Sequence, residues 1–339
     1  MHRPHRSRPR RAALALGTLL ITALALGACG GDDDTLTVYS GRDEGLVGPL
    51  LDRFSDETGV ELEVRYGDSA ELAATILEEG DAAPADVFFS QDAGSLGALE
   101  REGLLSELDT EVLARVDRPF RSRDGRWVGV SGRARVIAYD SRELSEADLP
   151  DSVLDLTDPE WEGRVGWAPT NGSFQAFVTA LRLTEGDDEA RQWLEDMVAS
   201  GTVAFDSNIP IRDAIAAGEI DLGLINHYYV AEAKAEDPDY PVDVHSPEGD
   251  IGAMINVAGA GILASSDHPQ EAAELVDFLL GAEAQQYFAS ETKEYPLIEG
   301  VEVDPGIVPL ARIEHPNVDL SNLDDLQGTL TVIEESGAL

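Results

Sequence analysis

Two adjacent tyrosines, Tyr228 and Tyr229, are the residues of this chain whose type and position point most directly to chemistry. They follow the apolar run 221–225 and the polar pair Asn226 and His227. The run predicts a buried strand, and side chains just past the carboxyl end of such a strand lie where open α/β sheets bind ligands. Two converging phenolate oxygens suit a hard trivalent cation, ferric iron above all. Taken alone, the pair has a plainer interpretation, in which one ring packs in the core and the other is half exposed.

The first 29 residues predict export and lipid attachment. Residues 1–11 carry five arginines, residues 12–27 are apolar, and residues 26–29 resemble a lipoprotein processing site that ends at Cys29, the only cysteine of the chain. We therefore predict a signal peptide over 1–28, acylation of Cys29 and a tether over 29–34. The mature protein is then anchored on the extracytoplasmic face of the cell membrane. An ordinary signal peptide or an N-terminal membrane anchor is the alternative.

The charge balance is strongly acidic. Asp and Glu number 66 against 24 Lys and Arg, a formal net charge of −42, and the lysines are only Lys234 and Lys293. Such a surface argues against a nucleic-acid partner. It also suggests a source that lives at high salt, where screening relieves the self-repulsion of the surface.

The rest of the chain alternates between strand and helix patterns. Strands are expected at 36–39, 60–66, 86–89, 135–139, 163–167, 221–225 and 259–263, and helices at 46–58, 71–79, 93–102, 174–183, 189–200, 211–217 and 269–280. This alternation predicts an α/β fold with mostly parallel sheets and helices on both faces. The length suits two domains, and the strand at 135–139 is placed to cross between them.

Seven short segments, in this order, carry a resemblance to a known family. They are TVYSGR at 37–42, GDSAEL at 67–72, PADVF at 84–88, GRARVI at 132–137, WAPTNGSF at 167–174, INHYY at 225–229 and EYPL at 294–297. With them the mature chain resembles the periplasmic ferric-ion-binding proteins, which are the solute receptors of iron(III) ABC importers.

The resemblance implies a two-lobed type II periplasmic-binding-protein fold that closes by a hinge around its ligand. Lobe 1 would comprise 35–134 and 257–305, and lobe 2 would comprise 135–256 and 306–339. It also implies a monomer that delivers its ligand to the permease and ATPase subunits of an ABC transporter. No enzymatic motif accompanies these segments, so we do not expect an enzyme.

The metal ligands that the resemblance implies match only in part. Tyr228 and Tyr229 align with the family's tyrosine pair, Asp43 occupies the position of a His ligand, and Gln91 that of a Glu ligand. Asp43 is a suitable oxygen ligand for iron, whereas the neutral amide of Gln91 is better suited to hold a water or an anion. Where another branch of the family has a third tyrosine, this chain has Phe174. Tyr139 on the crossing strand is a further candidate, with a core or hinge role as its alternative.

The family also holds a synergistic anion, carbonate or phosphate, beside the iron. The positions that match its anion site are Asn171, Gly172, Ser173, Asn208 and Asn226, with Arg42 and Arg133 as charged donors from the opposite lobe. Residues 171–173 precede the helix expected at 174, where free N–H groups favour an anion. Without the family, Asn171 is an ordinary helix cap and Arg133 a surface ion pair.

The remaining alternatives concern His227 and the class of ligand. Its family counterpart is a non-ligating Asn, so we expect His227 behind the ligands or exposed. Loss of the His and Glu ligands also leaves open a receptor for a small organic or phosphonate anion. A hydrolase descended from a binding fold would need a nucleophile and a base that the sequence does not offer.

Overall fold

Strands from residues 35–339, the part of the chain that the computed structural model describes, join in one ten-stranded sheet. Its main order is β2-β1-β3-β9-β4-β7-β5-β6, with β8 and β10 also paired to β4. The strands are β1 Thr35–Ser40, β2 Glu61–Tyr66, β3 Val87–Ser90, β4 Val128–Asp140, β5 Val165–Trp167, β6 Val203–Ala204, β7 Leu222–Asn226, β8 Val242–His245, β9 Ile255–Ile262 and β10 Tyr295–Pro296. The predicted signal peptide, Cys29 and the tether lie outside the described residues.

The expected α/β class is confirmed, and the pairing of the strands is mixed rather than mostly parallel. Strand β1 runs parallel to β2 and β3, and β5 runs parallel to β6 and β7. The long strands β4 and β9 run antiparallel to all their neighbours. The sequence suggested parallel sheets because strand and helix alternate locally, whereas these central strands are joined to their neighbours by connections that span much of the chain.

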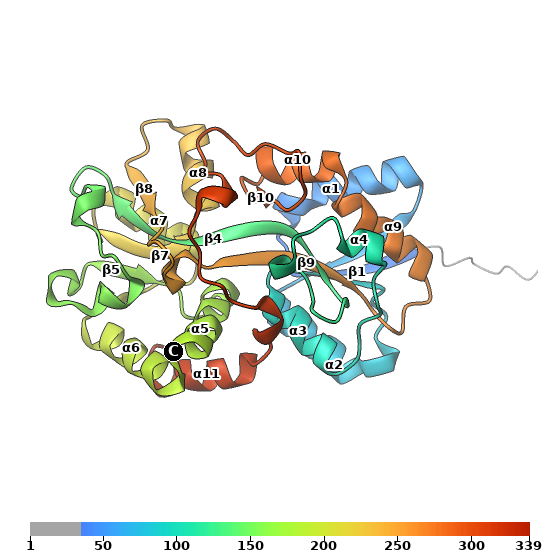
Figure 1. Ribbon diagram of the computed structural model, residues 1–339, viewed down its shortest axis with the longest axis horizontal. Helices are drawn as coiled ribbons and strands as arrows, with labels where there is room; N and C mark the ends of the chain where they lie inside the picture. The colour runs from blue at the N-terminus through green and yellow to red at the C-terminus, as the bar shows by residue number, and fades with distance from the viewer. Residues whose placement is uncertain (1–34) are drawn as a thin grey trace, which may run out of the picture. The chain divides into compact units, whose positions relative to one another are not determined.

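Strand β4 changes partners within its length. Its first part pairs with β9 up to Ala134, opposite Ile255, and its second part pairs with β7 from Arg135, opposite Asn226. Figure 1 shows β4 and β9 side by side as they run between the two groups of strands. The change falls at 134/135, the boundary expected between lobes 1 and 2, and the lobe assignment itself stays a prediction.

Helices follow most strands. They are α1 Glu44–Thr58, α2 Ser69–Glu79, α3 Ala93–Arg101, α4 Thr110–Leu113, α5 Gly172–Glu185, α6 Asp187–Ala199, α7 Asn208–Ala217, α8 Tyr228–Glu236, α9 Pro269–Leu279, α10 Ala282–Ser290 and α11 Leu326–Glu335. Of these, α1, α2, α3, α5, α6, α7 and α9 lie at the positions that the sequence predicts, whereas α4, α8, α10 and α11 were not predicted. The C-terminal helix α11 packs on α5 and α6 (Figure 1). Within residues 35–339, none of the helices has the length and hydropathy that crossing a bilayer requires.

Asp and Asn side chains cap four of the helices that follow strands. Asp43 caps α1 after β1, Asp68 caps α2 after β2, Asp92 caps α3 after β3, and Asn171 caps α5 after β5. Each side chain accepts a hydrogen bond from a backbone N–H of the first turn, which satisfies a donor that the helix leaves free. The short loops between strand and helix are therefore held in place by local hydrogen bonds.

Candidate functional site

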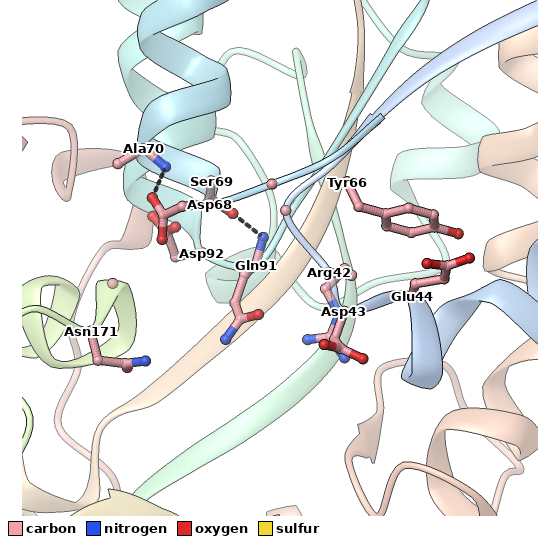
Figure 2. A pocket seen from close by; sticks show the side chains of 13 residues that line it. Arg42, Asp43, Glu44, Tyr66, Asp68, Ser69, Ala70, Gln91, Asp92 and Asn171 are labelled. Carbon is pink, nitrogen blue, oxygen red and sulfur yellow. Dashed lines mark hydrogen bonds between the residues drawn. The ribbon is translucent and has the colours of Figure 1, made fainter. Parts of the chain in front are cut away.

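A cavity of about 480 Å³ lies where β1, β2 and β3 end and α5 begins. Its lining includes Arg42 and Asp43 after β1, Gln91 and Asp92 after β3, and Asn171 at the start of α5. Figure 2 shows the amide groups of Gln91 and Asn171 pointing into this space. Residues expected in lobe 1 and in lobe 2 thus line one cavity.

The two candidate ligands from the first part of the chain are held by their own loops. Asp43 is exposed, and its Oδ1 accepts a hydrogen bond of 2.8 Å from the N–H of Gly45. Gln91 is half-buried, and its backbone N–H donates to Ser69 Oγ at 2.8 Å, which leaves the side-chain amide directed into the cavity (Figure 2).

The start of α5 forms a polar cluster with the end of β7. Asn226 Nδ2 donates to Ser173 Oγ at 3.3 Å, and Ser173 Oγ donates to Asn171 Oδ1 at 2.5 Å. Strand β7 places Asn226 here because its last residue lies opposite Arg135 of β4. The structure therefore brings Asn171, Ser173 and Asn226 together, as the family pattern implies.

Asn208, the first residue of α7, is buried with its polar atoms unused. It is 1% exposed, and neither Oδ1 nor Nδ2 has a hydrogen-bond partner among residues 35–339. Because a buried amide without partners is costly, such a side chain marks a place where a ligand or ordered water completes the structure.

The tyrosine pair forms the first turn of α8. The two ring centroids are 4.2 Å apart, Tyr228 is buried, and Tyr229 is half-buried. The sequence did not predict this helix, which begins as soon as β7 ends. The turn therefore places one ring in the interior and leaves the other partly accessible to solvent.

Burial controls the protonation of Tyr228. It raises the pKa of Tyr228 well above its usual value, and the neighbouring Tyr229 adds to this effect. The positive charges of Arg133 and Arg42 act in the opposite direction and favour the phenolate. The phenol of Tyr228 is therefore protonated at neutral pH until another positive charge arrives.

Three buried arginines surround these tyrosines. Arg42 donates from both terminal nitrogens to Glu294, at 2.9 and 2.8 Å. Burial opposes the charge of Arg42, but Glu294 and both tyrosines outweigh that effect and raise its pKa. The fork of Arg42 is thus occupied by a carboxylate.

Arg133 has no such partner. It is 1% exposed, its Nε lies 3.8 Å from Glu294, and none of its three side-chain nitrogens has a hydrogen-bond partner among the described residues. Of the two arginines proposed as anion donors, Arg133 is the one whose donors are free.

Sequence reasoning did not select Arg135 or Glu294 as site residues, although both lie in the segments that carry the resemblance. Arg135 donates to the carbonyl oxygen of Leu224 at 2.9 Å and lies over the rings of Phe174 and Phe177. Burial lowers the pKa of Arg135 to about 9, and the tyrosines act to raise it. Nothing local in the sequence shows that these residues lie near the tyrosines, because they come from distant segments of the chain.

Tyr139 lies apart from the tyrosine pair, whereas the ring of His227 packs edge-on against that of Tyr228, with ring centroids 6.0 Å apart. Tyr139 is opposite Leu222, at the other end of β7 from Asn226, and the charges that act on it are those of Asp243 and Glu146. His227 is buried, stacks on Tyr295 with ring centroids 4.4 Å apart, and accepts a hydrogen bond from Ala134 N–H through Nδ1. Burial lowers its pKa to about 4, so it supports the start of α8 as a neutral ring.

The described residues available for a metal do not include the usual cluster of His, Cys, Asp and Glu side chains. Within residues 35–339, no group of three or more His, Cys, Asp and Glu side chains is arranged to hold a metal ion. Tyr228 and Tyr229 are the remaining candidate ligands, although neither is among the residues that line the cavity of about 480 Å³. Phenolates and a carboxylate form an all-oxygen, anionic donor set, which fits ferric iron.

Comparison with known proteins defines the class. Residues 82–322 match the model of the family described as bacterial extracellular solute-binding protein, and the chain belongs to that family. It is 33% identical over 321 residues to the Fe(3+)-binding periplasmic protein of Serratia marcescens, covering 93% of this chain and 94% of that protein. It is also 33% identical to the major ferric iron-binding protein of Neisseria meningitidis, covering 89% and 92%.

Solved structures show the same fold. The iron-bound HitA protein of Pseudomonas aeruginosa superimposes with a TM-score of 0.85 at 36% identity, covering 89% of this chain and 99% of that one. A Trichodesmium protein in complex with iron and citrate superimposes with a TM-score of 0.78 at 25% identity, covering 89% and 99%. The expected type II periplasmic-binding-protein fold is therefore confirmed.

Proposed function

We propose that this chain is an extracytoplasmic receptor that binds ferric iron through Tyr228 and Tyr229 and delivers it to the permease and ATPase of an ABC importer. The observation that carries the proposal is the tyrosine pair, whose ring centroids are 4.2 Å apart, with its buried member Tyr228 close to the charge of Arg133. The names of the relatives from Serratia marcescens and Neisseria meningitidis, both iron-binding proteins, support it.

The charges of the site support a synergistic anion. Ferric iron with two phenolates keeps a positive charge, and the buried residues Arg42, Arg133 and Arg135 add more than the buried carboxylates of Glu294 and Asp92 offset. Such an excess in a low-dielectric setting must be compensated. Carbonate or phosphate can bridge the iron to Arg133 and to the start of α5, where Asn171 and Ser173 lie.

Delivery fits the strand arrangement and the N-terminal segment. Strand β4 exchanges partners at 134/135, so a rotation there would move residues 35–134 with 257–305 against residues 135–256 with 306–339. Closure of these lobes would bring Asp43 and Gln91 toward the tyrosines. The lipid at Cys29 would keep the receptor, as a monomer, beside the importer.

The test is an iron titration followed by visible absorbance. The wild-type protein should develop a charge-transfer band, because tyrosinate bound to ferric iron absorbs visible light. Tyr228→Phe and Tyr229→Phe should each weaken binding by orders of magnitude, since each removes an anionic oxygen and keeps the ring. Tyr139→Phe, on β4 opposite Leu222 at the start of β7, is the matched control and should bind as the wild type does.

The same titration separates iron from other ligands. A wild-type protein without the band, but with affinity for a phosphonate or another small anion, would overturn the proposal in favour of an anion receptor. That alternative draws on the free donors of Arg133 and Asn208.

The anion is tested by its removal. Rigorous depletion of carbonate and phosphate should weaken iron binding sharply, and adding either one back should restore it. If anion-free protein binds iron equally tightly, protein side chains complete the iron's coordination.

A further inference from the structure

Helix α8 has two different faces. At about 100° per residue, Tyr228, Glu232 and Tyr229 fall on one face, with Glu232 between the two tyrosines and one turn further along. On the other side of the helix, Val230, Ala231, Lys234 and Ala235 line a separate cavity of about 530 Å³. The only acidic side chain within one turn of the tyrosine pair on α8 is therefore on the tyrosine face.

The direction of helical side chains brings Glu232 closer still. Each Cα–Cβ bond tilts toward the amino end of the helix, so a long side chain covers the turn before its own. The turn before Glu232 is the one that carries Tyr228 and Tyr229. A glutamate here extends back toward the turn that carries the tyrosines.

The surroundings of Glu232 agree with this placement. The charges that act on it include those of Glu294 and Arg42, the buried pair beside Tyr228, and also that of Arg212. Arg212 is engaged elsewhere, since it pairs with Asp213 and donates to the carbonyl oxygen of Tyr229 at 3.1 Å.

Glu232 is also without a partner. It is half-buried, and its side-chain carboxylate makes no hydrogen bond or ion pair within residues 35–339. Burial raises its pKa to about 7. A carboxylate held partly out of water with nothing bound to it is unfavourable, and a bound cation would compensate for that cost.

We propose that Glu232 is a ligand of the bound ferric iron and supplies, from the tyrosine helix itself, the carboxylate that is missing at Gln91. This inference rests on the proposed function and deepens it, because it specifies how the site completes its anionic donors. Iron would then bind Tyr228, Tyr229 and Glu232, all from one helix, before Asp43 approaches from the opposite lobe.

The experiment compares Glu232→Gln with the wild type in the presence of carbonate. Iron affinity, measured by competition with citrate, should fall at least about tenfold, the loss that even a supporting residue causes at a metal site. The charge-transfer band should shift, because a change of ligand alters the electron density at the iron to which the tyrosinates are bound. Glu232→Asp, with a shorter reach, should give an intermediate affinity.

Glu236→Gln is the matched control. Glu236 lies one turn beyond Glu232 on the same helix but is exposed. The Glu236→Gln variant removes the same charge at a greater distance from the phenols, so its charge-transfer band should keep the wild-type position. Thermal unfolding of each variant without iron checks that the fold is intact.

The outcomes distinguish this inference from the proposed function. If wild-type protein shows the iron band and Glu232→Gln keeps both its affinity and its band, the inference is overturned and iron binding by the tyrosines stands. Equal weakening in Glu232→Gln and Glu236→Gln with unmoved bands would also overturn it, since only remote charge would be acting. If the wild type binds no iron, both fail together.

Discussion

To bind a metal, the phenol of Tyr228 must lose its proton in a place where burial favours keeping it. Tyr228 lies among positive charges that are otherwise only partly compensated, with Glu294 shared between Arg42 and Arg133. The arginines alone do not overcome burial, so the cation itself must drive ionisation. Binding of iron and release of protons are thus one reaction.

Iron affinity should therefore depend steeply on pH. Because the pKa of Tyr228 is raised above its usual value, the iron-free site holds this proton across the neutral range, and iron must displace it at every pH in that range. Each proton released makes the affinity fall about tenfold per pH unit of acidification. Iron affinity measured by competition should decline steadily from about pH 8 to pH 5. This whole range lies below the reference pKa of Tyr, which is near 10.

A flat profile over that range would contradict phenolate ligation. Tyr228→Phe provides the control, since it removes one of the displaced protons and should show a shallower slope along with its weaker binding.

At the scale of elements, the tyrosines are positioned by close packing of α7 on β7. A Cβ built on Gly223 would lie 2.3 Å from Cγ2 of Ile211 and 3.0 Å from Cδ1 of Ile215. Helix and strand approach this closely only because position 223 carries no side chain. The same helix begins with Asn208 and the same strand ends with Asn226, so the packing also sets the spacing of the polar cluster.

Gly223→Ala should consequently destabilise the protein by about 1–3 kcal/mol, the usual cost of overpacking a core. Chemical denaturation measures this loss. The double variant Gly223→Ala with Ile211→Ala should be less destabilised than the sum of the single variants, because the second change makes room for the first. Strict additivity would mean that α7 and β7 are not in the contact described here.

At the scale of the whole molecule, acidic residues dominate the electrostatics. The formal net charge of −42 repels itself in dilute buffer, while the buried arginines form a local positive region within that acidic chain. Salt shortens the range of the repulsion from about 10 Å at 0.1 M to about 3 Å at 1 M.

The melting temperature should therefore rise as salt is increased from low to molar concentrations. Differential scanning calorimetry across a sodium chloride series measures it, and sodium sulfate must be kept out because it also strengthens apolar burial. A melting temperature that does not change with sodium chloride would show that the acidic surface is not the limiting factor for stability.

Local patterns were enough to predict much of this protein. Apolar runs and amphipathic segments predicted most of the strands and helices, because those features depend on neighbours a few residues away. The position of Tyr228 and Tyr229 after a buried strand followed from the same logic. The helix α8 was not predicted, since two aromatic residues at its start are weak helix formers and it forms against the packed sheet.

Only the tertiary structure decided how the site is completed. The pairing of Arg42 with Glu294 joins residues 252 positions apart, and the change of partner along β4 depends on strands from distant parts of the chain. The free donors of Arg133, and the absence of any hydrogen bond or ion pair to Glu232 within residues 35–339, likewise emerge only when every neighbour is in place. A sequence specifies such contacts through the free energy of the whole fold, because burial and charge compensation are shared among residues that no local pattern connects.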